Sequence, residues 1–369
     1  MQKRELMNYI KNNLTIYLFI SLAVLVGCQS SPNSEQDGLK MSDMRVLGTH
    51  NSYKKPIDDV LKKIMEERAP GSVRGLEYGF PSLFEQLDAG IRKLELDVVY
   101  DPEGGMYSQP YGFVELKKMG VDINEFDPEN KMSAPGFKVL HIPDVDYRTQ
   151  CYTFMDCLEE VQQWSQEHPN HLPITIMMNA KDGGAGPEPF VQPLEFNTQA
   201  FQDWDNEIRA AIPESQLLTP DDVRGDFETL EQAILERGWP LLEQVKGKIL
   251  FLLDHSDKKM RTYIEGHPSL KGRAMFVNAP QGTPEASFMV INDPIRDLER
   301  IKEMVQLGYM VRTRADANTT EARENDYSRF EAAIESGAQI ISTDYYQPDT
   351  LFGTGFHIQM EMYPPENGH

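Results

Sequence analysis

The stretch Leu298–Arg314, LERIKEMVQLGYMVRTR, decides the fold, because it contains one complete helix-to-strand unit. Its apolar residues recur every three or four positions, the spacing of one face of an amphipathic helix. Gly308 follows, and glycine is the residue that most often ends a helix. The apolar and β-branched residues after it predict a strand. The same order of helix, glycine and strand recurs around Gly90 and Gly337.

This pattern predicts eight strands, with helical segments between most of them. Alternating strands and helices imply a parallel sheet, and eight such strands predict an α/β fold of the (β/α)8 TIM-barrel type, with its site at the C-terminal strand ends. An open doubly wound sheet is the alternative, but no glycine-rich phosphate loop follows the first strand. Long connections at 53–82, 100–136 and 180–245 are expected to carry loops over the C-terminal face. The strands are expected near residues 44–49, 91–99, 137–141, 172–179, 248–254, 274–278, 308–314 and 338–343.

The charge balance limits the kinds of partner. The 369 residues carry a formal net charge of -22. This argues against nucleic acid, because Lys and Arg contacts to phosphate dominate its binding. It also disfavours a simple electrostatic grip on anionic membranes. An acidic protein that handles a phosphate needs a basic pocket or a bound cation.

The N-terminus has the features of a targeting segment. Basic residues precede an apolar run at 16–26, which is too short for a comfortable transmembrane helix and is typical of a signal peptide. Cys28 follows Gly27, and this junction resembles a bacterial lipoprotein signal. We therefore expect a signal peptide at 1–27, a lipidated Cys28 and a flexible tether at 28–41. The protein is then an exported lipoprotein, anchored to a membrane in the periplasm or at the cell surface. An ordinary signal peptide with a chance cysteine is the alternative.

Two cysteines remain after Cys28, and an oxidising compartment favours a disulfide between them. Cys151 and Cys157 lie six residues apart. In one continuous helix they would lie on opposite faces and too far apart to bond. A disulfide therefore requires Cys151 to precede the helix and fold back on its first turn. Two free buried thiols are the alternative.

Polar and ionisable residues end nearly every predicted strand. Glu95 and Asp97 are two apart and therefore share a face of their strand, as do Arg312 and Arg314. Any one of these residues alone is equally well explained as a cap or an ion-pair partner, but a barrel brings its strand ends together. The strand-end residues are His50, Asn51, Glu95, Asp97, His141, Asn179, Lys181, Asp254, His255, Arg312, Arg314 and Asp344.

These residue types indicate a particular chemistry. Asn51, Glu95 and Asp97 offer only oxygen ligands, which suit a hard cation such as Ca2+. His50 and His141 suit proton transfer near neutral pH. A hard cation with two imidazoles is the apparatus of phosphodiester cleavage, in which one imidazole accepts a proton from the nucleophile and the other donates one to the leaving oxygen.

Several blocks of sequence resemble phosphatidylinositol-specific phospholipase C, in particular its calcium-dependent bacterial branch. The resemblance begins with Gly48–Tyr53, GTHNSY, with Glu95–Val98, ELDV, and with the following His141. It extends over roughly residues 42–355, essentially the mature domain expected at 42–369. The further matching blocks are Cys151–Leu158, Leu218–Gly225, Val311–Asp316 and Ser342–Tyr346.

The resemblance implies a distorted barrel and a defined reaction. The inositol 2-hydroxyl attacks the phosphorus of an inositol phospholipid, diacylglycerol leaves, and a cyclic inositol phosphate forms that can then be hydrolysed. His50 and His141 would be the acid/base pair, and Asn51, Glu95 and Asp97 would bind Ca2+. The sequence does not decide which histidine is the base; we favour His50 beside the nucleophile and His141 at the leaving oxygen.

One position departs from the family pattern. The fourth strand of this family usually supplies a glutamate to the metal, whereas this chain has Asn179. The amide keeps an oxygen ligand but removes one negative charge, which should weaken Ca2+ binding. Lys181, Arg312, Arg314 and Asp344 are expected to contact the substrate, on the strength of their position.

Two other functions are compatible with part of this pattern. Glycerophosphodiester phosphodiesterases use the same barrel, but their first strand usually continues His-Arg-Gly, whereas this one reads His50-Asn51-Ser52. A surface lipoprotein that binds polyols or glycans without catalysis is the second alternative, and the intact histidine pair argues against it. Neither the natural head group nor the oligomeric state follows from the sequence.

Overall fold

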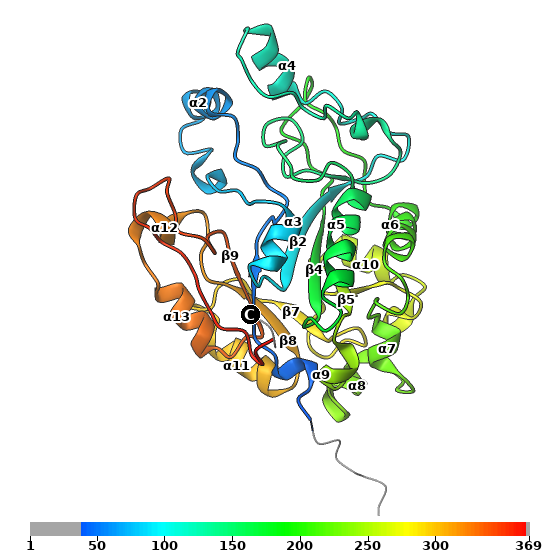
Figure 1. The fold of residues 1–369 in the computed structure, drawn as a ribbon. Coiled ribbons are helices and arrows are strands. Elements are labelled where there is room, and N and C mark those ends of the chain that lie inside the picture. Colours follow the sequence, from blue (N-terminus) through cyan, green and yellow to red (C-terminus); the bar gives the residue numbers. More distant parts are fainter. Residues whose placement is uncertain (1–37, 367–369) are drawn as a thin grey trace, which may run out of the picture. The chain divides into compact units, whose positions relative to one another are not determined.

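A curved parallel sheet forms the centre of the molecule, and helices surround it (Figure 1). The structure is a computed structural model and describes residues 38–366. Eight strands follow the order β6-β5-β4-β2-β1-β9-β8-β7, and a single parallel bridge between Asn278 and Phe288 joins the two ends. The result is a nearly closed TIM barrel, as predicted. The strands are β1 (Val46–Thr49), β2 (Lys93–Val99), β4 (Ile174–Ala180), β5 (Ile249–Leu253), β6 (Met275–Val277), β7 (Phe288–Val290), β8 (Met310–Arg314) and β9 (Ile340–Thr343).

Seven of the eight predicted strands belong to this barrel, and the strand predicted at 137–141 does not. Only Lys138–Val139 form a strand there, β3, which pairs antiparallel with the end of β2 and lies off the barrel path. The eighth barrel strand is β7, which the sequence pattern did not reveal. β7 has three residues, too few to show a period of two. The predicted count was therefore right, but one of its members was wrong.

Three helices end where their glycines predicted. Gly90, Gly308 and Gly337 all have positive φ and follow α3, α11 and α13. Glycine adopts this left-handed conformation without steric cost, so the chain can leave the helix and enter the next strand. The helices are α2 (Asp59–Arg68), α3 (Leu83–Asp88), α4 (Tyr111–Lys118), α5 (Phe154–Glu167), α6 (Thr198–Ala211), α7 (Pro220–Arg224), α8 (Leu230–Glu236), α9 (Leu242–Val245), α10 (Lys258–Ile264), α11 (Leu298–Gln306), α12 (Thr320–Glu324) and α13 (Ser328–Glu335), with 3-10 turns at Met41–Asp43, Arg74–Leu76, Lys131–Ser133 and Pro268–Leu270.

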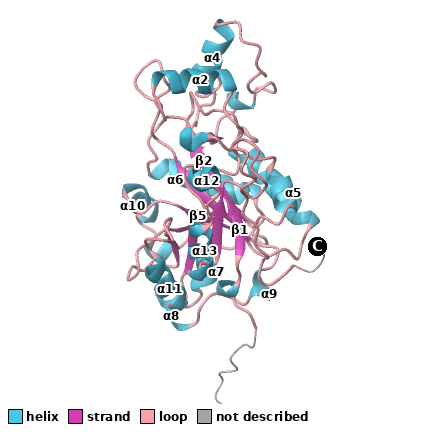
Figure 2. Cartoon of the chain, turned by 90° about the vertical axis from the view of Figure 1, so that its left-hand side faces the viewer, coloured by secondary structure: helices cyan, strands magenta, loops and turns pink. Residues whose placement is uncertain are grey.

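Two apolar clusters hold the domain together. The larger one fills the barrel and the layer between strands and helices, where every residue of β2 is buried. A second cluster includes Leu61 of α2 and Phe113 and Leu116 of α4. These helices belong to the long connections after β1 and β2, and they lie beside each other beyond the C-terminal ends of the strands (Figure 2). The predicted loops over the barrel mouth therefore carry a small core of their own.

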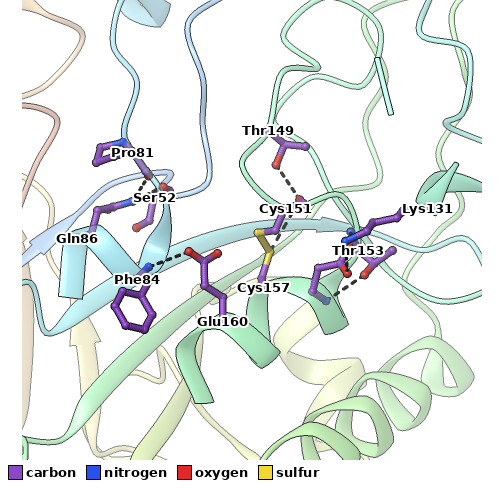
Figure 3. The surroundings of a disulfide bond; sticks show 11 residues. Ser52, Pro81, Phe84, Gln86, Lys131, Thr149, Cys151, Thr153, Cys157 and Glu160 are labelled. Atoms are coloured by element: carbon purple, nitrogen blue, oxygen red, sulfur yellow. Dashed lines mark hydrogen bonds and ion pairs between the residues drawn. A yellow bond between two sulfur atoms is a disulfide. The ribbon is translucent and has the colours of Figure 1, made fainter. Parts of the chain in front are cut away.

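Cys151 and Cys157 form the disulfide that was considered from the sequence (Figure 3). α5 begins at Phe154, and the hydroxyl of Thr153 caps it by accepting a hydrogen bond from the Asp156 amide. Cys151 thus precedes the helix, and its Cα lies 5.3 Å from that of Cys157. The required geometry, with the chain folding back on the first helical turn, is confirmed.

The predicted N-terminal features fall mostly outside the described residues. The signal peptide at 1–27 and the lipidated Cys28 lie there entirely. The end of the expected tether is described, and there Lys40 pairs with Leu241 and Met41 is fully buried. Within residues 38–366, no helix is long and apolar enough to cross a membrane.

Candidate active site

The first strand delivers His50 and Asn51 to the mouth of the barrel. β1 lies between β2 and β9, and the His50 amide still donates to the Thr343 carbonyl of β9 at 3.2 Å. At Asn51 the chain turns with a φ of 51°, a left-handed conformation that asparagine adopts more readily than most residues. The backbone conformation is therefore a second explanation for asparagine at position 51. Its side-chain amide donates to the Tyr78 hydroxyl at 2.8 Å.

His50 is held by a buried carboxylate. Its Nδ1 lies 2.8 Å from Asp344 Oδ1, and Arg314 Nη2 lies 3.2 Å from Asp344 Oδ2. An ionised carboxylate only accepts hydrogen bonds, so Nδ1 carries the proton and Nε2 is left to accept one. Burial, reinforced by Arg314, lowers the pKa of His50. Burial alone would raise the pKa of Asp344, but His50 and Arg314 outweigh it and lower that pKa.

Glu95 and Asp97 are buried on one face of β2, as the alternation predicted. Glu95 Oε2 lies 2.5 Å from Lys93 Nζ and 3.0 Å from Arg312 Nη2. Glu95 Oε1 accepts from Asn179 Nδ2 at 3.1 Å and lies 3.8 Å from His50 Nε2. These contacts bring His50, Glu95, Asn179 and Arg312 into one network.

Lys93 was not foreseen, although its position gave a signal. It shares the face of β2 with Glu95, two residues earlier, so the alternation that selected Glu95 selects it as well. Its Nζ donates to the Thr49 carbonyl at 3.0 Å, and burial lowers its pKa to about 7. A Cβ on Gly48 would lie 2.7 Å from the Lys93 side chain. Glycine at position 48 therefore leaves the space that this lysine fills.

His141 has a carboxylate partner of its own. The amide of Leu140 donates to the Asp97 carbonyl at 3.2 Å, which places the start of this loop beside the end of β2. His141 Nδ1 lies 2.7 Å from Asp146 Oδ2, and Asp146 Oδ1 lies 3.3 Å from the buried Lys54 Nζ. The ring again has Nδ1 occupied, and its Nε2 has no hydrogen-bond partner in the described part of the chain. Asp146 and Lys54 were not foreseen, because no strand or motif marks either residue.

Four residues were predicted to bind substrate, and their side chains already contact other protein groups. Lys181 Nζ lies 3.1 Å from Asp97 Oδ2. Arg312 donates to Glu95, to Ser342 at 2.9 Å and to Asn292. Arg314 and Asp344 hold each other beside His50. Asp344 and Arg314 thus serve to position His50, and direct substrate contacts by any of the four stay predictions.

Two cavities open beside these groups. A cavity of about 740 Å³ has His141, Asn179 and Lys181 in its lining. A smaller cavity of about 360 Å³ is lined by Tyr78 and Asp344, the two partners of His50. His141 therefore lines the larger cavity itself, whereas His50 lines neither cavity and only its partners Tyr78 and Asp344 line the smaller one.

The predicted metal ligands form an oxygen-only set. Asp97 Oδ1 is buried and has no hydrogen-bond partner among the described residues, as expected of a ligand atom. Asn179 is the register partner of Asp97 on the neighbouring strand. Within residues 38–366, no three histidine, cysteine or acidic side chains lie close enough together to hold a metal ion. The donor set suits a hard cation, but it contains only two carboxylates and depends on the amides of Asn51 and Asn179.

One further acid lies near this set. Asp254 follows β5, and burial and the Glu95 charge raise its pKa to about 6. Its Oδ1 accepts a hydrogen bond from Asn278 Nδ2 at 3.2 Å. Lys93 and Arg312 contact Glu95, and Lys181 contacts Asp97. A cation bound by these two carboxylates would have to compete with the three side chains, and the weak Ca2+ site expected from Asn179 stays a prediction.

Comparisons with known proteins give a consistent result. The sequence model of a family described as "Phosphoinositide phospholipase C, Ca2+-dependent" matches residues 39–366. No curated protein sequence matches the chain. The fold is similar to a calcium-dependent phosphoinositol-specific phospholipase C from a Pseudomonas species, with a TM-score of 0.50 and 17% identity over 83% of this chain and 91% of that one. It is also similar to a Ca2+-dependent phosphatidylinositol-specific phospholipase C from Streptomyces antibioticus, with a TM-score of 0.51 and 16% identity over 84% and 95% of the two chains.

Proposed function

The chain belongs to the family of Ca2+-dependent phosphoinositide phospholipases C, and from this premise we propose that it cleaves phosphatidylinositol or a related inositol phosphodiester. Members of this family are phosphodiesterases. The observation that carries the proposal is the pair of histidines, His50 and His141, each with Nδ1 on a buried carboxylate and no hydrogen bond to Nε2 from residues 38–366. General acid–base catalysis needs two such groups, one to accept and one to donate a proton.

His50 is the base in this proposal. Its lowered pKa keeps the ring neutral near pH 7, and Asp344 fixes the tautomer that leaves Nε2 able to accept. Nε2 takes the proton of the inositol 2-hydroxyl as its oxygen attacks the phosphorus. Asp344 and Arg314 hold the ring in place and stabilise the imidazolium that forms.

His141 is the acid. Its protonated Nε2 donates to the glycerol oxygen as the phosphorus–oxygen bond breaks, and Asp146 orients the ring through Nδ1. The products are diacylglycerol and a cyclic inositol phosphate. Hydrolysis of the cyclic product reverses the two roles, because a water molecule then enters where the glycerol oxygen left.

Asn51, Glu95, Asp97 and Asn179 would hold the Ca2+. A Ca2+ ion held there would supply positive charge to the phosphate. Lys181 lines the cavity beside His141, and we assign it to the phosphate oxygens. We assign Arg312, Arg314 and Asp344 to the inositol hydroxyls. They also hold Glu95 and His50 in place.

We also propose that the protein works as an exported lipoprotein. The signal features at 1–27 and the lipidation position Cys28 support this location. The residues between Cys28 and Lys40 would tether the folded domain, to which Lys40 and Met41 already belong, to the membrane. Such an anchor would keep the enzyme near its lipid substrate without requiring a basic surface.

Turnover of phosphatidylinositol with and without Ca2+, followed by phosphorus NMR of the product, tests the function. The proposal predicts a cyclic inositol phosphate that appears only with Ca2+. Cleavage of glycerophosphoinositol without cleavage of phosphatidylinositol would instead favour a glycerophosphodiester phosphodiesterase. No turnover of either substrate would favour a binding protein.

A further inference from the structure

The larger cavity lies between the barrel mouth and the two helices beyond it. Its volume is about 740 Å³, within the range of sites that enclose most of a small ligand. One part of its wall is apolar and comes from α2, α4 and the loops after β3 and β4. The side chains that form this apolar wall are Leu61, Ile64, Met65, Leu116, Ile142 and Phe190.

The other part of the same cavity carries catalytic groups. His141, Asn179 and Lys181 line it, and His141 is the direct neighbour in the chain of Ile142 in the apolar wall. Charged side chains at this end are already paired, Lys181 with Asp97 at 3.1 Å and Lys259 with Asp182 at 2.7 Å. The cavity therefore leads from the predicted proton donor to a surface that favours hydrocarbon.

We propose that this cavity binds the hydrocarbon of the leaving group, so that the enzyme selects lipid-linked inositol phosphodiesters one molecule at a time. The inference rests on the proposed function, because it takes His141 as the acid. His141 gives its proton to the leaving oxygen, which carries the hydrocarbon of the leaving group. That group must extend from His141, and the space lined by His141 is the apolar cavity.

The apolar wall of the larger cavity and the net charge of the protein support this occupant. The smaller cavity, at Tyr78 and Asp344, mixes charged side chains such as Lys62 with apolar ones such as Phe80 and has about half the volume. The net charge of -22 gives no general attraction to anionic membranes, so capture of a chain has to come from apolar contact. Each buried methylene contributes roughly a fourfold gain in binding.

Leu61 and Gly112 show how the wall is formed. A Cβ on Gly112 would lie 2.8 Å from Leu61 Cδ2 and 2.8 Å from the Asp144 carbonyl. Glycine at this position of α4 allows the close approach of α2 and of the loop that carries His141. The apolar wall and the catalytic loop are therefore built as one unit.

A series of inositol alkyl phosphodiesters tests the proposal, with leaving alcohols from methyl to octyl, all kept below their micelle concentration. For the wild-type protein, kcat/KM should rise by up to about fourfold per methylene until the cavity is full. Ile64→Asp should flatten this rise and reduce octyl turnover by at least about tenfold, while methyl turnover changes less than about twofold. Met65→Gln, which keeps the volume and is gentler on folding, should act in the same direction.

Leu235→Asp is the matched control, because Leu235 is 48% exposed on α8 and does not line either cavity. It should leave the dependence on chain length unchanged. An equal rise with chain length in the wild type, Ile64→Asp and Met65→Gln would overturn the proposal, as would a flat series in the wild type. Absence of turnover for every ester would contradict the proposed function instead.

A binding measurement separates failure of the hydrocarbon site from failure of the proposed function. Calorimetry with octyl phosphate and methyl phosphate requires no turnover. The cavity predicts tighter binding of octyl phosphate to the wild type, and loss of that preference in Ile64→Asp but not in Leu235→Asp. Equal affinity of the wild type for both phosphates would refute the hydrocarbon site even in an inactive protein.

Discussion

The two histidine–aspartate pairs have the same local geometry but stand on different parts of the molecule. His50 and Asp344 follow β1 and β9, neighbouring strands of the barrel. His141 and Asp146 lie five residues apart in a single loop beyond β3, and a buried lysine, Lys54, supports them. The first pair is fixed by the barrel, the second by an inserted segment that also forms the wall of a cavity.

This difference suggests a division of labour. In the proposed mechanism, the inositol 2-hydroxyl is common to every substrate of the class, and its proposed base, His50, is fixed by the barrel. The leaving group differs from one substrate to another, and the segment that carries the proposed acid, His141, also lines the larger cavity. Loops on a fixed scaffold are where enzymes most often adapt to their substrates.

Removal of either imidazole should have the largest effect. His50→Ala and His141→Ala should each lower turnover of phosphatidylinositol by about 10^2-fold or more, the usual contribution of a positioned acid or base. Circular dichroism and thermal melting should show a folded protein in both cases, since neither ring is fully buried. Turnover close to that of the wild type in either variant would remove that histidine from the mechanism.

Changes in the charge of the proposed metal ligands should have the next largest effect. Asp97→Asn should raise the Ca2+ concentration for half-maximal activity by roughly tenfold, because affinity follows ligand charge. Asn179→Glu should lower it, because it adds a carboxylate. The measurement is a titration of activity against free Ca2+ for the three proteins. An unchanged midpoint in Asn179→Glu would exclude Asn179 from the metal shell, and full activity in excess chelator would exclude the metal.

The pH profile should distinguish the barrel pair from the loop pair. Burial and Arg314 together lower the pKa of His50, so Arg314→Gln should raise it. The base is active when neutral, and activity is lost as the pH falls through this pKa. The acidic limb of kcat/KM should therefore move to higher pH in Arg314→Gln. Lys54→Gln, the corresponding change behind His141, should leave that limb in place, and an equal shift in both variants would contradict the assignment.

The disulfide should have the smallest effect on turnover. Cys151 belongs to the segment that follows Asp146, and its bond to Cys157 closes a short loop. Reduction should lower the free energy of unfolding by about 2 kcal/mol by the loop-entropy account, with little change in activity. Melting temperatures with and without reductant measure this effect. The melting temperature of a Cys151→Ser, Cys157→Ser double variant should not change with reductant. If the melting temperature of the wild type does not change either, the bond adds no stability.

Both members of the barrel pair, His50 and Asp344, could be predicted from the sequence as site residues. Of the loop pair, only His141 could be predicted. His50, Glu95, Asp97 and Asp344 all follow or lie on strands, and a periodic strand fixes which residues share a face. Lys93 obeys the same rule and was overlooked because a buried lysine is rare. Asp146 is different, because only the three-dimensional path of the loop brings it to His141.

The fold shows the same division. Strands preceded by an amphipathic helix and glycine, such as β8 and β9, were predicted correctly. β7 was missed because Phe288–Val290 are too few to show a period. The segment at 137–141 is apolar like a barrel strand, yet only Lys138 and Val139 pair, and they pair antiparallel with β2. Local pattern predicts which residues extend, whereas tertiary contacts decide which strand they join.

The most direct test of the division between base and acid compares two substrates. Phosphatidylinositol has a poor leaving group that needs a proton, whereas inositol 4-nitrophenyl phosphate has a good one that does not. The account predicts that His141→Ala regains turnover on the nitrophenyl ester to within about tenfold of the wild type, because the acid is then dispensable. His50→Ala should stay impaired on both substrates. Equal impairment of His141→Ala on the two esters, or recovery of His50→Ala on the nitrophenyl ester, would contradict the assignment.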